Sequence, residues 1–175
     1  MRSIPIILLL LLQAGLAGAQ ADNFPAGWTG HWKGELQWFR QGKTDPQKVN
    51  MELHIQPGDS IDTYTWQIIY GSAAEDNRPY ILKPVSTPAG HWRIDERNGI
   101  VLDQFWVGNR FCGAFTVQGN TILNSYQKTG DQLVVEFYSL PAKPLVTTGN
   151  GTDESPKVDS YRISGFQRAV LTKVN

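Results

Sequence analysis

The side chains of this chain that could carry out chemistry are few and scattered. Its three histidines are His31, His54 and His91, and none is spaced from another as in a metal-binding H-x-x-x-H motif. His54 shares the polar face of an alternating segment with Glu52, so we expect an exposed imidazole there. His31 and His91 each lie in a Gly-His-Trp triplet, where a histidine that caps the start of a strand is the simpler interpretation. We therefore expect no metal site and no cofactor.

Acidic, hydroxyl and thiol groups do not form a catalytic pattern either. Asp95 and Glu96, with Asp103 nearby, come closest to paired carboxylates, but neighbours on a strand point to opposite faces, whereas glycosidase chemistry needs both carboxyl groups in one cleft. The sequence has no G-x-S-x-G nucleophile motif and no phosphate-binding glycine loop. Cys112 is the single cysteine, which we expect to act as a small buried apolar residue. These patterns favour a protein that binds over one that catalyses.

The first 21 residues have the pattern of an export signal. Arg2 supplies the charged start, residues 4–12 are almost wholly aliphatic, and a small-residue stretch with the Ala17-x-Ala19 cleavage pattern follows. The apolar run is too short to span a bilayer. We predict a signal peptide over residues 1–21 and one domain over residues 22–175, located in a periplasm or outside the cell.

Charge and hydropathy narrow the choice of partners. The chain has 16 basic and 16 acidic residues, and its basic residues are scattered along the sequence. Nucleic-acid binding proteins instead concentrate positive charge on one face, so we expect no nucleic acid. No second apolar run is long enough for a membrane span. A small apolar molecule remains open as a ligand, and a protein partner is not identified by the sequence.

Short strands must position whatever site exists. Apolar and polar residues alternate over residues 32–38, 49–56 and 63–70, which is the period of a half-buried strand. Asn98-Gly99 is the strongest hairpin signal and predicts a two-residue type I′ turn. Tight turns then recur at strand-length spacing as far as residue 140.

Three segments depart from this rhythm. Residues 78–83 contain Pro79 and are followed by Pro84, which predicts a short strand that is either irregular or at a sheet edge. Residues 141–157 are too long for a hairpin loop and are typical of a functional lid or a mobile loop. Residues 158–174 predict one long final strand, bent near Gly165.

The succession of hairpins predicts an all-β fold, a single up-and-down antiparallel β-barrel of about ten strands. An open meander of this length would leave two long edges, and closure removes them. The competing fold is a two-sheet sandwich, which favours Greek-key crossings over consecutive tight turns.

Gly30-x-Trp32 at the start of the first strand, the meander, and Arg168 on the last strand resemble the calycin group of lipocalins, fatty-acid-binding proteins and nitrobindin-like barrels. In lipocalins the first-strand tryptophan lies at the closed end of the barrel, under an Arg or Lys from a later segment. The resemblance implies structural roles for Gly30 and Trp32, with Arg168 or Arg162 as the basic partner.

The chain departs from two members of this group. Residues 41–48 are too few for the helix-turn-helix lid of fatty-acid-binding proteins. Nitrobindin-like barrels bind haem through a histidine near the C-terminal strand, and no histidine follows His91 here, which argues against haem.

The resulting hypothesis is an exported non-catalytic barrel that binds a small, largely apolar ligand in its interior. The alternative is a barrel with a filled interior that acts as a protein-interaction or envelope-associated module. A cavity of roughly several hundred Å³ would favour the first, and a filled barrel the second. Which strand faces point inward is left open. The predicted ligand-binding residues are Tyr64, Trp66, Tyr70, Gln104, Trp106, Phe115 and Asn124.

Overall fold

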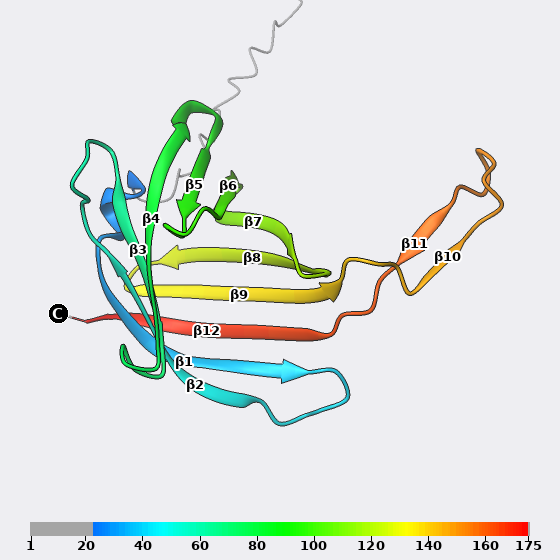
Figure 1. Cartoon of the computed structure of the whole chain (residues 1–175), viewed down its shortest axis with the longest axis horizontal. Coiled ribbons are helices and arrows are strands. Elements are labelled where there is room, and N and C mark those ends of the chain that lie inside the picture. The colour runs from blue at the N-terminus through cyan, green and yellow to red at the C-terminus, as the bar shows by residue number, and fades with distance from the viewer. Residues whose placement is uncertain (1–22, 175) are drawn as a thin grey trace, which may run out of the picture.

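The computed structural model describes residues 23–174, and ten of its strands close into an antiparallel barrel (Figure 1). The strands follow one another around the barrel in the order β1-β12-β9-β8-β7-β6-β5-β4-β3-β2. Each strand therefore pairs with its neighbours in sequence, except that β10 and β11 are inserted before β12. This confirms the predicted up-and-down barrel. The predicted signal peptide lies outside the described residues.

The alternating segments of the sequence form the barrel strands. These are β1 (Gly30–Arg40), β2 (Gln47–Ile55), β3 (Tyr64–Tyr70), β4 (Asp76–Ser86), β5 (His91–Asp95), β6 (Val101–Val107), β7 (Arg110–Val117), β8 (Asn120–Thr129), β9 (Gln132–Pro141) and β12 (Gly165–Val174). Short 3-10 helices cover Ala26–Trp28 and Thr87–Ala89. Among residues 23–174, no helix has the length and apolarity that a membrane crossing requires.

The inserted segment is a hairpin and not an irregular loop. β10 (Val146–Thr148) pairs with β11 (Val158–Ser160) in a separate two-stranded sheet that projects from the barrel (Figure 1). The prediction of one continuous final strand is therefore wrong. The chain leaves the hairpin at Ser160 and joins the barrel only at Gly165, because the two parts pair with different strands.

Of the two alternatives for residues 78–83, the edge strand is wrong, whereas irregularity is observed at the following proline, since the register of β4 against β5 shifts between Pro84 and Ser86. β4 pairs with β3 along residues 76–82 and with β5 along residues 81–86. Pro79 lies where only β3 is a neighbour, and Pro84 where only β5 is. Proline has no backbone N–H to donate to a neighbouring strand. Because β4 is paired on only one side at each of these two positions, the closed barrel tolerates both prolines.

The β5–β6 hairpin exists, but its turn is longer than the predicted two-residue type I′ turn. The connection covers residues 96–100. Positive φ occurs at Arg97 and Gly99, and not at Asn98. The Asn98 side chain instead accepts a hydrogen bond from the Ile100 amide at 2.9 Å, which closes the turn through a side chain.

Aromatic side chains fill the end of the barrel that the N-terminal segment enters. Trp28 is fully buried, and the Phe24 ring packs edge-on against Trp28, Trp92 and Trp106 with centroid distances of 5.1–5.2 Å. Trp32 is fully buried as expected, and its Nε1 donates to the Trp28 carbonyl at 2.9 Å. Residues just before β1 therefore act as a plug for the barrel.

Candidate functional site

Beyond the aromatic plug, the barrel interior holds a cavity of about 70 Å³. Ligand pockets in proteins usually measure roughly 300–1,000 Å³, so this space is too small for a lipid or a haem. The barrel interior is therefore nearly filled by side chains. Five of the predicted ligand-binding residues do line this cavity, namely Trp66, Tyr70, Gln104, Phe115 and Asn124. Tyr64 and Trp106 instead pack against the core cluster and do not line the cavity.

A buried amide pair forms the polar part of this cavity. Asn124 Nδ2 donates to Gln104 Oε1 at 3.1 Å, and both side chains are buried. Gln104 Nε2 and Asn124 Oδ1 have no hydrogen-bond partner among the described residues. A buried unpaired polar atom costs about 1–3 kcal/mol, so this pair marks a place for a water molecule or a small polar group. Gly113 gives the pair its room, since a Cβ there would lie 2.2 Å from Gln104 Nε2.

A much larger hollow lies on the outside of the barrel, over β6 to β9. Its volume is about 700 Å³. β6 and β7 pair only between residues 105–107 and 110–112, and beyond Cys112 the pairing partner of β7 is β8. The hollow lies against this short junction. Its apolar walls are exposed by 43% to 64% and comprise Phe105, Val107, Leu123 and Tyr138.

The apolar walls continue as a ladder across neighbouring strands. On β8 and β9, Leu123 is the cross-strand partner of Tyr138. Tyr138 in turn pairs with Phe166 on β12, and Phe166 pairs with Phe39 on β1. Because direct cross-strand partners point to the same side of a sheet, all four side chains lie on the outer surface. The rings of Tyr138 and Phe166 are 4.8 Å apart, and those of Phe166 and Phe39 are 6.2 Å apart. We call these four residues, with Phe105 and Val107, the outer apolar face.

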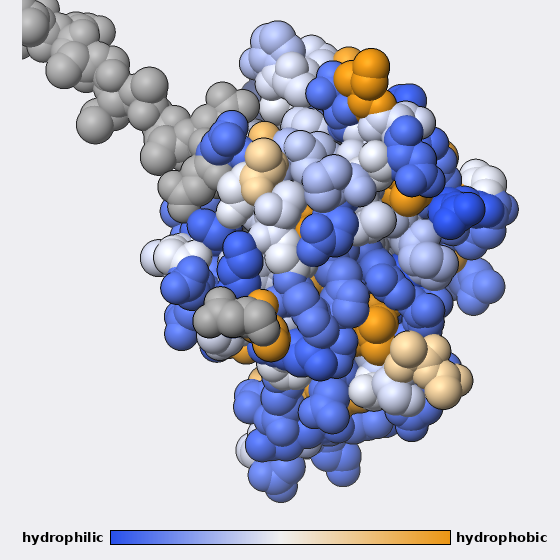
Figure 2. All heavy atoms as spheres, turned by 90° about the vertical axis from the view of Figure 1, so that its left-hand side faces the viewer, coloured by the Kyte–Doolittle hydropathy of each residue, from blue (hydrophilic) through white to orange (hydrophobic). Residues whose placement is uncertain are grey.

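Among the described residues, the left-hand side of the molecule in Figure 1 shows no continuous apolar face of this kind. Figure 2 shows the left-hand side of Figure 1, where hydrophilic residues dominate and hydrophobic residues form separate spots. The side of the molecule drawn in Figure 2 therefore differs from the β6–β9, β12 and β1 surface, which carries the outer apolar face.

Charged groups border the outer apolar face. Glu136 lies between two guanidinium groups, with Arg110 Nη1 at 2.9 Å and Arg168 Nε at 3.4 Å. These three side chains carry one net positive charge. The Cys112 thiol also lines the hollow, half-buried, and burial raises its pKa. Such a thiol stays protonated near neutral pH, which does not favour a nucleophilic role.

The basic partner of Trp32 is neither Arg168 nor Arg162, the two candidates that the calycin resemblance implied. Arg168 lies on the outer surface beside Glu136. Lys173 is instead the cross-strand partner of Trp32, and its Nζ lies 5.7 Å from the centroid of the indole ring. The register of β12 against β1 determines which basic residue lies beside Trp32: it pairs Trp32 with Lys173, five positions after Arg168.

Two of the three acidic residues that came closest to paired carboxylates in the sequence lie on the outer surface and form ion pairs. Asp95 contacts Lys83 Nζ at 2.6 Å, and Asp103 contacts Arg93 Nε at 2.8 Å. Hydrogen bonds from these cations hold the pKa of each carboxyl below its usual range. Glu96 lines the interior cavity instead.

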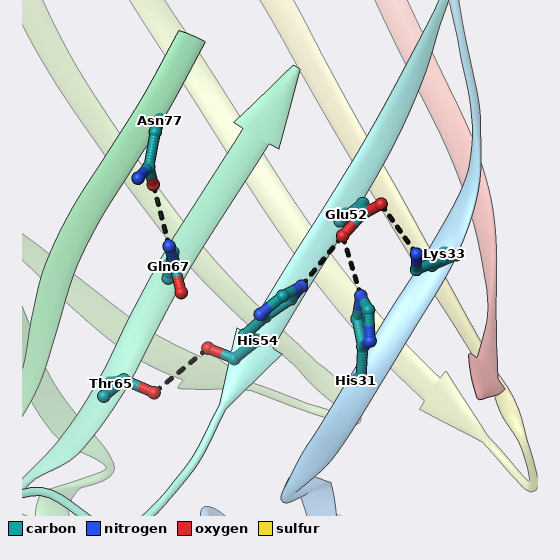
Figure 3. A network of polar contacts seen from close by, with 7 residues as sticks. All are labelled: His31, Lys33, Glu52, His54, Thr65, Gln67 and Asn77. Carbon is teal, nitrogen blue, oxygen red and sulfur yellow. Dashed lines mark hydrogen bonds and ion pairs between the residues drawn. The ribbon is translucent and has the colours of Figure 1, made fainter. Parts of the chain in front are cut away.

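A cluster that sequence reasoning did not assemble lies on the outer face of β1 and β2 (Figure 3). His31 and His54 are cross-strand partners, and the Nε2 atoms of both lie at 2.8 and 2.9 Å from Glu52 Oε2. Lys33 Nζ lies 2.9 Å from the other carboxylate oxygen. Burial raises the pKa of Glu52, but hydrogen bonds from Lys33, His54 and His31 outweigh it and lower the pKa to about 2. The signal available in the sequence was Glu52-x-His54 on one strand face.

Comparisons with known proteins give a fold and no family. No protein-family model and no curated protein matches the chain. A crystal structure of a protein of unknown function from the DUF3598 family of Nostoc punctiforme is similar, with a TM-score of 0.60 and 10% sequence identity. The match covers 83% of this chain and 47% of that one, so this chain spans about half of its length. At this identity the similarity supports the barrel fold alone.

Proposed function

We propose that this protein is an exported, non-catalytic barrel with a filled interior that binds a protein partner through its outer apolar face. The observation that carries the proposal is the contrast between the two hollows. The interior cavity measures about 70 Å³, whereas the outer hollow measures about 700 Å³ and has apolar walls. Export is supported by the signal-like pattern of residues 1–21.

The shape and composition of the outer apolar face favour a protein over a small molecule. The face continues from the hollow along the ladder to Phe39, so it is a long surface and not a closed pocket. The exposed rings of Phe105 and Tyr138 line the hollow together with Arg110 and Glu136, and aromatic and arginine side chains are enriched in protein interfaces. Contiguous exposed apolar patches on soluble proteins mark interaction sites.

We further propose a calycin-like origin for the barrel. Support comes from the meander order and from Trp32, which is buried beside the plug under a basic side chain, Lys173, of the last strand.

The test is affinity capture from an extract of the source organism with three forms of the protein. Leu123→Glu introduces a charge into the outer apolar face. Val85→Glu on β4 is the matched control, because Val85 is exposed by 45% and Leu123 by 44%. We expect wild type and Val85→Glu to retain the same partner and Leu123→Glu to lose it. Equal capture by all three forms would refute the proposal.

A second candidate function is the binding of a small polar molecule in the interior cavity. It is favoured by the unpaired Gln104 Nε2 and Asn124 Oδ1, which face a ligand-sized gap of about 70 Å³. Such a ligand must supply one acceptor and one donor. The test is a titration of Trp fluorescence with short amides and carboxylic acids, alongside fatty acids, haem and isoprenoids. A saturable change in Trp fluorescence with the short compounds, which Asn124→Leu abolishes, would support this second function. If no compound changes the fluorescence, this second function is refuted.

A further inference from the structure

The cluster on β1 and β2 brings three metal-ligating side chains to one point on the barrel surface. His31 and His54 face each other across the strand pair, with ring centroids 3.7 Å apart. Glu52 precedes His54 by two residues and so projects from the same face of β2. One ligand atom from each of the three lies within 4.8 Å of the others. Figure 3 shows both imidazole rings directed at the Glu52 carboxylate.

We propose that His31, Glu52 and His54 bind a divalent transition-metal ion, with zinc as the best match. Two imidazole nitrogens and one carboxylate oxygen are a donor set that zinc uses where a fourth position stays open. The proposal goes beyond the partner-binding function and does not depend on it, because the cluster lies on β1 and β2 and shares no residue with the outer apolar face.

The distances are close to those that such an ion needs. Zinc binds nitrogen and carboxylate oxygen at about 2.0–2.2 Å, which places tetrahedral ligand atoms about 3.4 Å apart. Here the two nitrogens lie 2.8 and 2.9 Å from Oε2. The carboxylate would have to withdraw by only about 0.5 Å to admit the ion. All three side chains are partly exposed, so a small rotation is available to each.

Surroundings of the cluster suit an open site. Lys33 holds the second carboxylate oxygen, Oε1, which leaves Oε2 for the ion. Glu52 also borders a surface hollow of about 410 Å³, which gives a path for the ion and for a water molecule in the fourth position. Lys33 adds a positive charge close by, but its side chain is 47% exposed, so solvent screens this charge.

A competing interpretation is a hydrogen-bonded network without metal. Oε2 can accept from both rings only when both Nε2 atoms carry hydrogen. With both hydrogens on Nδ1, two lone pairs and a carboxylate oxygen converge on one point, and a cation satisfies all three. The two interpretations differ in what zinc does to the protein.

The test uses the untagged mature protein, titrated with zinc chloride by calorimetry in metal-free buffer, and with cobalt followed by visible absorption. We expect one ion per chain and the absorption of a tetrahedral cobalt site. His31→Gln, Glu52→Gln and His54→Gln should each weaken zinc binding about 10-fold or more. His91→Gln is the matched control, because the third histidine pairs with Asp103 on the outer face of β5 and is no part of the cluster. It should leave zinc affinity unchanged.

A further variant separates metal ligation from the charge network. Lys33→Ala removes a hydrogen-bond donor to Glu52 and a positive charge. If the site binds metal, this variant should still bind one zinc ion per chain and lose less affinity than the three ligand variants, because Lys33 contacts only Oε1. Circular dichroism of each variant checks that the barrel has folded. The proposal is overturned if the wild type binds no zinc at one ion per chain, if the cluster variants bind as tightly as the wild type, or if His91→Gln loses as much affinity as they do.

Discussion

At the scale of single residues, Trp32 links the plug to the barrel. Its side chain is fully buried and its Nε1 donates to the Trp28 carbonyl. We predict that Trp32→Ala lowers the free energy of unfolding by about 3–5 kcal/mol, as expected when a large core side chain is truncated. Urea unfolding measures the change. Trp38→Ala, at a partly exposed position on the same strand, should lower it less. A loss below about 1 kcal/mol for Trp32→Ala would place this residue outside the core.

Gly113 is required by its neighbours and not by its backbone. A Cβ at this position would lie 2.2 Å from Gln104 Nε2 and 2.6 Å from Asn124 Oδ1. We predict that Gly113→Ala destabilises the protein by about 1–3 kcal/mol through overpacking. In a Gln104→Ala background the same substitution should be less destabilising, because the closest atom is gone. Strictly additive effects in this double-mutant cycle would contradict the packing argument.

Strand period predicted which residues share a strand face, but not which face points inward. Five of the seven predicted residues line one cavity, because alternation places every second side chain on one face. The cluster of His31, Glu52 and His54 could not be predicted in the same way. It depends on the pairing of His31 with His54, and this register is set by packing across the barrel.

At the scale of elements, the β5–β6 turn allows a direct test. Gly99 has a φ of +97°, which a β-branched residue resists. We predict that Gly99→Val destabilises the protein by about 1–2 kcal/mol. Asn98→Ala removes the acceptor for the Ile100 amide and should cost less, since that exposed amide can bond to water. Thermal unfolding of both variants checks the order, and an unchanged midpoint for Gly99→Val would contradict the account.

Strand existence was predictable, and strand boundaries were less so. The barrel strands alternate clearly because each has one face in the core. Residues 158–174 read as one strand because both parts are rich in strand-forming residues. The two parts are separate strands only because β11 pairs with β10, whereas β12 pairs within the barrel. Local strand propensity does not show which strands will pair.

At the scale of the whole molecule, stability should fall in alkali. Burial raises the pKa of Tyr70 and of Tyr126 above the ordinary value. The unfolded chain ionises these phenols near pH 10, whereas the folded chain keeps them neutral. Their contribution is therefore complete below about pH 10 and is lost as the pH rises through the folded pKa values. Urea unfolding between neutral pH and pH 11 should show this slope, and a Tyr70→Phe/Tyr126→Phe variant should reduce it. An equal slope in that variant would contradict the assignment.

The whole molecule divides into a nearly filled interior and an outer apolar face that we propose binds a partner. The aromatic plug and the small cavity leave little room inside, while the outer apolar face is large and accessible. This division is what supports our proposal of a filled barrel over an interior site for an apolar ligand. Strand period could not supply this contrast, because period shows which residues share a face and not how completely they fill the barrel.

Site-directed photo-crosslinking in cells of the source organism tests this division most directly. A photoreactive phenylalanine derivative is placed at Ala114, which lines the outer hollow, and separately at Val85 on β4 as the control. The account predicts a crosslinked adduct of the protein with one partner chain from position 114 and none from position 85. No adduct at position 114, or the same adducts from both positions, would contradict a partner-binding role for the outer apolar face.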